Sequence, residues 1–276
     1  MHKIKWIVQS NLFGEEAVTR LVDCLERMEF DYDLVKVIPF GGGVEPEVEN
    51  NGQPVVVIGS ISLVNHARKK GWFPGAWSNP KIYNFRHYLE QYGDKMLNYG
   101  GKIGTLRYVY SMVKEEKVFI RPLADDKSFA GAVMSDYDID EWRNRLVNAE
   151  KGWTVDLDTE ILVAPLKTIW SETRFVCQCD RICSGSQYKR GNRVLYSEVV
   201  DNHISDFAKS CIHPFTFGKP LDTMYVMDIA DTPEGPKIIE FNNVNSAGWY
   251  ECDIPSILSG FITAVNIEMR NIGYAA

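Results

Sequence analysis

Hydrophobic and polar positions follow a regular alternation over the first hundred residues. A short apolar run at Trp6–Val8 precedes a stretch in which apolar residues recur every three or four positions, as on one face of a helix. Those helical positions are Ala17, Val18, Leu21, Val22, Leu25 and Met28. Apolar runs at 34–37 and 55–58 are each followed by a glycine-containing loop, and a second helical stretch begins after Ser60. This order predicts βαβ units with a parallel sheet, and therefore an α/β lobe over residues 1–115.

The pattern changes near residue 116, where short apolar runs follow one another. The strands predicted for this half are 118–121, 161–164, 174–179, 225–229 and 238–241. Helices are predicted from Ser197 to Ala208 and from Asp253, an N-cap candidate, through Ile267. Residues 116–276 are therefore expected to form an α+β region.

The segment 223–248 holds the most informative polar residues. Two apolar runs flank DTPEGP, whose prolines and glycine predict the turn of an antiparallel hairpin. If the turn is centred on Glu234, Asp228 lies opposite Glu240, and Asn242 shares their face because strand side chains alternate. Opposed like charges need a cation, and hard oxygen ligands suit magnesium. A solvent-exposed polar face, or a register that separates the two acids, is the alternative interpretation.

Composition and charge restrict the class of protein. The 276 residues are 45% hydrophobic and 24% charged, which is typical of a folded chain with a substantial core. A net charge of -7 argues against binding to nucleic acid, whose phosphates attract basic surfaces. No run approaches the about 18 apolar residues that span a bilayer, and the first sixteen residues do not resemble a secretory signal. We expect a cytoplasmic protein without nucleic-acid or membrane partners.

The six cysteines include a cluster at Cys177, Cys179 and Cys183. In a chain that is expected to stay in the cytoplasm, cysteines are kept as thiols rather than disulfides. The spacing of the cluster, CxC followed by CxxxC, differs from the paired CxxC of zinc ribbons. Buried thiols are the expected state, and a zinc site is the alternative.

The hairpin residues resemble a known family. Glu240, Asn242, Asn245 and Gly248 in EFNNVNSAG resemble the ExN element that closes the active site of ATP-grasp carboxylate ligases, and Asp228 stands where that family has an upstream metal-binding acid. The resemblance implies that Asp228, Glu240 and Asn242 bind the Mg²⁺ ions that bridge the phosphates of ATP. It also implies that Asn245 belongs to the nucleotide site.

The stretch VFIRPLADDKSFAG resembles the strand and loop that cover the nucleotide phosphates in this family. Arg121 stands where most members have lysine, as in the arginine-variant ATP-grasp clade of many phage and bacterial proteins. A guanidinium can grip phosphate oxygens with a bidentate fork and does not lose its charge. The resemblance therefore implies that Arg121 clamps phosphate, and Lys127 is the cation of the glycine-poor loop that follows. A surface ion pair is the alternative for Arg121.

Two further segments carry the resemblance. ILVAPL resembles the hinge whose backbone binds adenine, which implies Val163, Ala164 and Leu166 as nucleotide contacts. SETRFV resembles the acid-x-Arg strand that follows the hinge, which implies Glu172 and Arg174. Residues two apart on a strand share a face, so we expect Arg174 toward phosphate and Glu172 toward ribose or a neighbouring cation. A structural salt bridge is the alternative for Glu172.

The tract SGSQYK resembles a strand and turn that line the acceptor side of relatives. This makes Ser186, Tyr188 and Lys189 substrate-site candidates. Local hydrogen bonding is the alternative, because serine and tyrosine often play that part near turns.

Together these segments cover residues from about 116 to 260 and imply an ATP-grasp fold, with residues 1–115 as the pre-ATP-grasp lobe. The implied activity is ATP-dependent ligation of a small-molecule or peptide carboxylate to an amine through an acyl phosphate. Arg121 and Arg174 would be the catalytic residues, and ATP and Mg²⁺ the cofactors. A kinase-type phosphotransferase and a non-catalytic ATP-binding module stay open as alternatives. The identity of the substrates, a homodimeric state, and a bacterial or phage-infected host cell also stay open.

Overall fold

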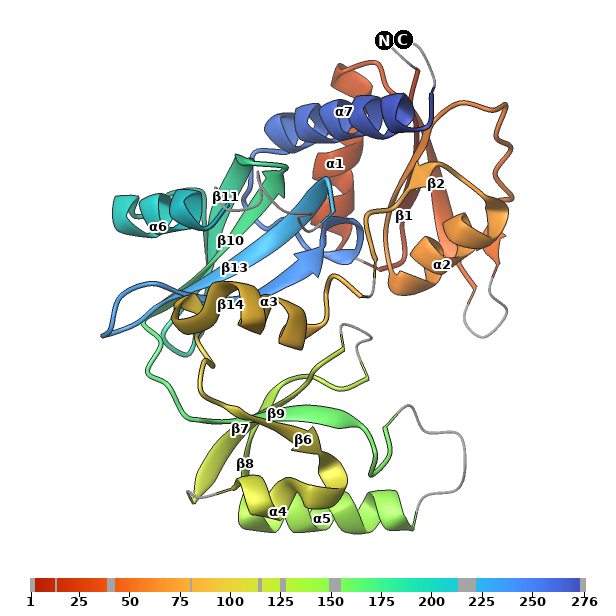
Figure 1. Ribbon diagram of the computed structural model, residues 1–276. Coiled ribbons are helices and arrows are strands. Elements are labelled where there is room, and N and C mark those ends of the chain that lie inside the picture. The colour runs from red at the N-terminus through yellow and green to blue at the C-terminus, as the bar shows by residue number, and fades with distance from the viewer. Residues whose placement is uncertain are drawn as a thin grey trace. The chain divides into compact units, whose positions relative to one another are not determined.

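The chain folds into two compact units that are built from interleaved segments. The structure, a computed structural model shown in Figure 1, describes residues 3–12, 14–38, 43–79, 81–113, 116–124, 128–148, 155–212 and 222–273. Unit 1 consists of Met1–Asn79, Ser171–Ile229 and Phe241–Ala276, and unit 2 consists of Pro80–Trp170 and Ala230–Glu240. The division of the chain at residue 115 stays a prediction.

Unit 1 begins with the parallel sheet that the apolar alternation predicts. Its strand order is β3-β2-β1-β4-β5, and β1 pairs in parallel with both β2 and β4. The strands are β1 (Lys5–Gln9), β2 (Asp31–Val37), β3 (Val44–Glu45), β4 (Val55–Ile58) and β5 (Pro74–Gly75), and the helices are α1 (Glu15–Arg27) and α2 (Ile61–Lys70). Ser60 caps α2 by accepting a hydrogen bond from the backbone N–H of Leu63, and Gly71 ends the helix at φ +68°. The predicted βαβ lobe is confirmed.

A second sheet has the strand order β12-β11-β10-β13-β14. Its strands are β10 (Ser171–Gln178), β11 (Arg181–Arg190), β12 (Arg193–Ser197), β13 (Met224–Asp231) and β14 (Lys237–Asn243). β10, β11 and β12 pair antiparallel, which confirms the α+β character of this half. β14 leads directly into the short η4 helix (Val244–Ser246).

The predicted helix start at Ser197 is wrong. α6 spans Asn202–Ile212, and Ser197 ends the edge strand β12. Val194 pairs with Lys189 of β11, so cross-strand hydrogen bonds override the helical spacing of the apolar residues here. The helix begins only where the carbonyl of Asp201 accepts hydrogen bonds from the backbone of Ile204 and Ser205.

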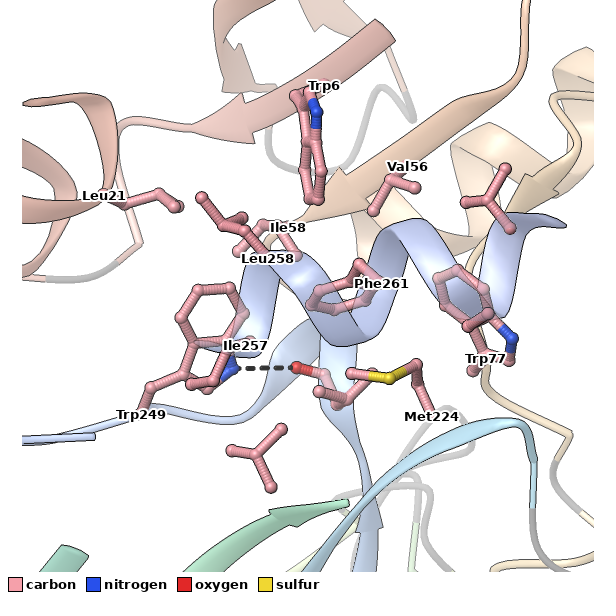
Figure 2. Packing of buried hydrophobic residues seen from close by; sticks show 14 of the residues in the cluster. Trp6, Leu21, Val56, Ile58, Trp77, Met224, Trp249, Ile257, Leu258 and Phe261 are labelled. Carbon is pink, nitrogen blue, oxygen red and sulfur yellow. Dashed lines mark hydrogen bonds between the residues drawn. The ribbon is translucent and has the colours of Figure 1, made fainter. Parts of the chain in front are cut away.

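The core of unit 1 forms around α7 (Ile254–Asn271), which begins at the predicted N-cap Asp253. Asp253 accepts a hydrogen bond from the backbone N–H of Ser256 at 3.0 Å. Figure 2 shows Phe261 of α7 among aromatic side chains from distant parts of the chain. The ring centroid of Phe261 lies 5.6 Å from that of Trp6 and 5.3 Å from that of Trp77. α7 is therefore the element that joins the N-terminal sheet to the second sheet in one core.

Unit 2 contains an antiparallel sheet of order β6-β9-β7-β8. Its strands are β6 (Lys102–Thr105), β7 (Lys117–Pro122), β8 (Ala132–Ser135) and β9 (Glu160–Pro165), and its helices are α3 (Phe85–Tyr92), α4 (Val109–Met112) and α5 (Asp136–Val147). Val109 of α4 and Ile139 of α5 share one apolar core with Ile120 and Ile161 of the sheet. Both helices therefore cover the same face of the sheet (Figure 1). α5 starts with a capping box between Ser135 and Asp138.

The predicted hairpin is present. β13 and β14 are neighbours in the sheet, and residues 232–236 connect them. Thr232 closes the turn, because its hydroxyl donates to the carbonyl of Gly235 at 2.7 Å and its carbonyl accepts from the Gly235 N–H at 3.0 Å. Gly235 has φ +93°, which favours glycine at this position. The predicted register, with Asp228 opposite Glu240, stays a prediction.

Among the described residues, no helix has both the length and the apolar composition that a membrane crossing requires.

Candidate active site

Arg174 and Asp228 form a buried ion pair in unit 1. Arg174 lies on β10 and Asp228 on the adjacent strand β13. Arg174 Nε donates to Asp228 Oδ1 at 2.8 Å, and Arg174 Nη2 donates to Asp228 Oδ2 at 2.7 Å. The Asp228 side chain is 2% exposed, so an unpaired charge there would be costly. The cation that the sequence analysis required for this carboxylate is, in this structure, Arg174.

The surroundings of the pair hold Arg174 in a single orientation. Burial lowers the pKa of Arg174, but the charge and hydrogen bonds of Asp228 outweigh it, and the pKa is raised above its ordinary value. Arg174 Nη1 also donates to the carbonyl of Gly248 at 2.9 Å. Asn242 Nδ2 lies 3.4 Å from Asp228 Oδ2 and donates to it. Of the three residues predicted to bind magnesium, Asp228 and Asn242 are thus in contact.

Glu172 accepts hydrogen bonds from two consecutive residues of β11. Tyr188 Oη donates to Glu172 Oε2 at 2.7 Å, and Lys189 Nζ donates to Glu172 Oε1 at 2.6 Å. Consecutive side chains of a regular strand point to opposite faces, but here Glu172 pairs with Lys189 and Thr173 with Gln187. The bulge leaves Tyr188 as the extra residue and brings both side chains to one carboxylate. The neighbouring cation expected for Glu172 is therefore Lys189, as a salt bridge.

Tyr250 adds an aromatic group that the sequence analysis missed. Its ring stacks on Tyr188 at 4.9 Å and 22°, and on Tyr196 at 5.1 Å and 21°. Arg174 Cζ lies 5.0 Å from the centroid of the Tyr250 ring. Burial raises the pKa of both Tyr188 and Tyr250, so both hydroxyls stay protonated at neutral pH. No local motif marks Tyr250, because it follows the ExN-like element and meets the other tyrosines only through the fold.

Arg121 and Glu240 form a second ion pair, in unit 2. Arg121 Nη2 lies 2.8 Å from Glu240 Oε2, and the two side chains are 12% and 25% exposed. The guanidinium carbon of Arg121 also lies 4.6 Å from the centroid of the Phe85 ring. The alternative interpretation of Arg121 as an ion-paired residue is therefore met, although the pair is mostly buried. Its role toward phosphate stays a prediction.

The predicted hinge residues lie at the end of β9. Val163 and Ala164 are buried in this strand, which pairs with β6 on one side and with β7 on the other. Leu166 follows the strand and is half-exposed. Together with Lys167 and Thr168 it borders a cavity of about 400 Å³ within unit 2. The contact of this segment with adenine stays a prediction.

Three other candidates have mainly local contacts or cannot be placed. Asn245 is fully buried, and its amide bonds the backbone at both ends: Oδ1 accepts from the Trp77 N–H at 2.8 Å, and Nδ2 donates to the Val57 carbonyl at 2.7 Å. The hydroxyl of Ser186 accepts from the backbone N–H of Glu251 at 3.2 Å. Lys127 lies outside the described residues. The roles of these residues in ligand binding stay predictions.

The carboxylates and the amide fit a magnesium site by their chemistry. Asp228, Glu240 and Asn242 offer oxygen atoms, and protein-bound magnesium usually has one or two carboxylates and completes its shell with water and phosphate. No group of three or more His, Cys, Asp or Glu side chains that could hold a metal occurs in the described part of the chain. A site here would therefore depend on nucleotide phosphates for part of its coordination.

The same search gives no support to zinc at the cysteine cluster. All six cysteines are free thiols, as expected. Burial raises the pKa of Cys177, and it raises the pKa of Cys252 to about 12.

A comparison with protein families decides the question of kinship. A model of the ATP-grasp domain, the second family of one ATP-grasp clade, matches residues 100–259, which is more than half of the chain. This chain belongs to the ATP-grasp family. The resemblance seen in the hairpin and in the Arg121 strand is thereby confirmed, and both ion pairs of the ATP-grasp chain lie within the matched residues.

Solved structures show the same fold. D-cycloserine synthetase DcsG matches with a TM-score of 0.63 at 8% identity, covering 96% of this chain and 99% of that one. D-alanine–D-alanine ligase from Bacillus anthracis complexed with ATP matches with a TM-score of 0.58 at 10% identity, covering 99% and 100%. ATP-grasp ligase PsnB complexed with the precursor peptide PsnA2 and AMPPNP matches with a TM-score of 0.54 at 12% identity, covering 96% and 97%.

These matches extend over nearly the whole chain, so the ATP-grasp fold includes the first lobe, which the sequence related to the family only by its βαβ pattern. A search of curated proteins finds no match.

Proposed function

We propose that this ATP-grasp chain is an ATP-dependent ligase that joins a carboxylate to an amine through an acyl phosphate. The observation that carries the proposal is the buried cluster of Arg174, Asp228 and Asn242 inside the family match. A buried carboxylate, a fixed cation and an amide from three neighbouring strands are costly to maintain in a core, and structural need alone is met more cheaply by apolar residues. Their presence supports a role in binding a charged ligand.

In the proposed reaction the substrate carboxylate attacks the γ-phosphorus of ATP, and ADP leaves. The amine then attacks the acyl carbon, loses a proton and expels inorganic phosphate. The chain needs no nucleophile of its own, because positioning and charge neutralisation account for most of the catalysis of phosphoryl transfer. Bound magnesium, held by Asp228, Glu240 and Asn242, would neutralise part of the phosphate charge.

Arg174 retains donors for this purpose. A guanidinium has five N–H groups, and three of those of Arg174 are used in its bonds to Asp228 and Gly248 within the described residues. The other two can donate to phosphate oxygens without loss of the ion pair. Asp228 and Tyr250 keep the guanidinium in place, so little conformational entropy is lost when an anion binds.

A second candidate is an ATP-binding module without turnover. It is favoured by the finding that each of the two predicted metal-binding carboxylates is already paired with an arginine, Asp228 with Arg174 and Glu240 with Arg121. An arginine that satisfies a carboxylate lowers its need for a metal ion. In that case ATP would bind through the arginines, and no acceptor would stimulate ADP release.

The test is magnesium-dependent release of ADP in the presence of pooled amino acids, short peptides and amines, with mass spectrometry of the products. A product lighter than its two substrates by one water establishes a ligase. A phosphorylated acceptor points to a kinase-type phosphotransferase, and ATP binding by calorimetry without ADP release points to the binding module.

The variant Glu240→Gln tests the metal assignment, with Glu141→Gln as its control. Both remove one carboxylate charge, but Glu141 is exposed on α5. We expect Glu240→Gln to lose turnover at least a hundredfold and Glu141→Gln to keep it. Normal turnover of Glu240→Gln at saturating magnesium would show that Glu240 is not a metal ligand.

A further inference from the structure

A cavity of about 360 Å³ lies beside the Arg174 cluster within unit 1. Its walls come from β1, β4, α1, β12 and the segment after β14. Gly248 and Tyr250 belong both to these walls and to the surroundings of Arg174, which donates to the Gly248 carbonyl at 2.9 Å. We call this cavity the tyrosine pocket. Ligand pockets have volumes of roughly 300–1,000 Å³, so the tyrosine pocket suits a small ligand or one residue of a larger one.

The lining of the tyrosine pocket is mainly apolar. Six of its residues are Val8, Val18, Leu21, Ile58, Trp249 and Ile254, three of which are labelled in Figure 2. Two charged residues of the lining, Arg20 and Glu251, pair with each other at 2.8 Å, so their charges offset one another. The third, Glu16, is exposed. A charged group placed against the apolar walls would lose its hydration without gaining a counter-ion, which is costly.

The aromatic wall of the pocket has a defined position. Tyr250 is held between Tyr188 and Tyr196, and its backbone carbonyl accepts a hydrogen bond from Arg20 at 3.1 Å. Tyr250 also has φ +50°, in the left-handed region that residues other than glycine rarely adopt. Such backbone conformations persist only where the surroundings enforce them, and they are concentrated at ligand sites. The wall is therefore built to keep one shape.

We propose that the tyrosine pocket receives the uncharged, apolar side chain of an amino-acid or peptide substrate, and that Tyr250 sets the position of this substrate relative to Arg174. This inference rests on the proposed ligase function, because it names the class of substrate for the same site. The apolar lining selects against charged side chains, and the fixed tyrosine stack limits the size of the side chain that fits.

The test measures binding of free amino acids without nucleotide, so that its outcome does not depend on turnover. The probes are leucine and phenylalanine in both enantiomers, with glutamate and lysine as charged comparisons. Saturation-transfer NMR detects binding, and Trp249 in the pocket wall supplies a fluorescence signal. We expect at least one apolar amino acid to bind at least tenfold more tightly than either charged one.

Ala17→Trp is the blocking variant, and Thr19→Trp is its control. Both residues are exposed on α1, but only Ala17 lines the pocket, so the two variants place the same side chain inside and outside it. Ala17→Trp should weaken binding of the apolar amino acid at least tenfold, whereas Thr19→Trp should not change it. Equal binding by the two variants, or a wild-type chain that binds none of the apolar amino acids or prefers the charged ones, would overturn the inference.

The same preparations separate this inference from the proposed function. Calorimetry with AMPPNP reports on the nucleotide site alone. Apolar binding without ADP release in any acceptor panel would support the pocket and contradict the ligase. ADP release with acceptors that have charged side chains, and unchanged turnover in Ala17→Trp, would support the ligase and contradict the pocket.

Discussion

Arg174 grips Asp228 with two parallel hydrogen bonds, of 2.8 Å from Nε and 2.7 Å from Nη2. This fork is the strongest geometry available to an arginine and a carboxylate. It joins β10 to β13 through side chains as well as backbone, and it occurs where the carboxylate is 2% exposed. Stability and charge at the candidate site therefore depend on the same two residues.

Breaking this pair from one side should destabilise the chain more than replacing both residues. Arg174→Met leaves a buried, unpaired carboxylate, and we expect the free energy of unfolding to fall by about 3–5 kcal/mol. In the double variant Arg174→Met/Asp228→Leu no charge remains, and the loss should be clearly smaller. Urea denaturation of the single and double variants measures the difference. Equal losses would mean that the pair is not coupled as the structure shows.

The core around α7 should respond strongly to removal of Phe261. This side chain is fully buried and contacts Trp6, Trp77 and Trp249. Phe261→Ala leaves a cavity between two sheets, and we expect a loss of about 3–5 kcal/mol in the free energy of unfolding. Ser259→Ala, at an exposed position of the same helix, should change it by less than about 0.5 kcal/mol. A Phe261→Ala loss as small as that of Ser259→Ala would contradict this packing.

Acid should weaken unit 1 through Asp31. The hydrogen bond from Lys5 Nζ to Asp31 Oδ1, at 2.9 Å, holds the pKa of Asp31 below its ordinary value. Because the folded pKa is the lower one, the contribution is present above the unfolded pKa of about 4 and is lost as the pH falls through the folded pKa. Asp31→Asn should therefore flatten the loss of stability below pH 4, measured by urea denaturation as a function of pH. The exposed Asp180→Asn serves as the control, and equal profiles for the two variants would contradict the assignment.

The buried thiols should resist alkylation in the folded chain. With a pKa of about 12, Cys252 is thiolate in about one molecule in ten thousand at pH 8. Cys177 is also fully buried with a raised pKa. Iodoacetamide followed by mass spectrometry should modify neither residue in the native state, and both in denaturing urea. Rapid labelling of Cys252 in the native protein would contradict its burial.

Much of the fold follows from local patterns in the sequence. The apolar run at 55–58 matches β4 at both ends, and the turn chemistry of DTPEGP matches the loop between β13 and β14. Asp253 caps α7 as its position before an apolar periodic stretch indicates. These features depend on residues a few positions apart, so the chain states them directly. The helix start at Ser197 failed because pairing of β12 with β11 is not a local property.

The candidate site shows the same limit. The sequence by itself singled out Asp228, Glu240, Asn242, Arg121 and Arg174 and determined the ATP-grasp family, because these residue types recur in motifs of fixed spacing. Only the tertiary structure decided that arginines pair with the two acids, that a bulge brings Tyr188 and Lys189 to Glu172, and that Tyr250 completes an aromatic stack. Such contacts join residues far apart in the chain. Their geometry depends on strand order and register, which local spacing does not encode.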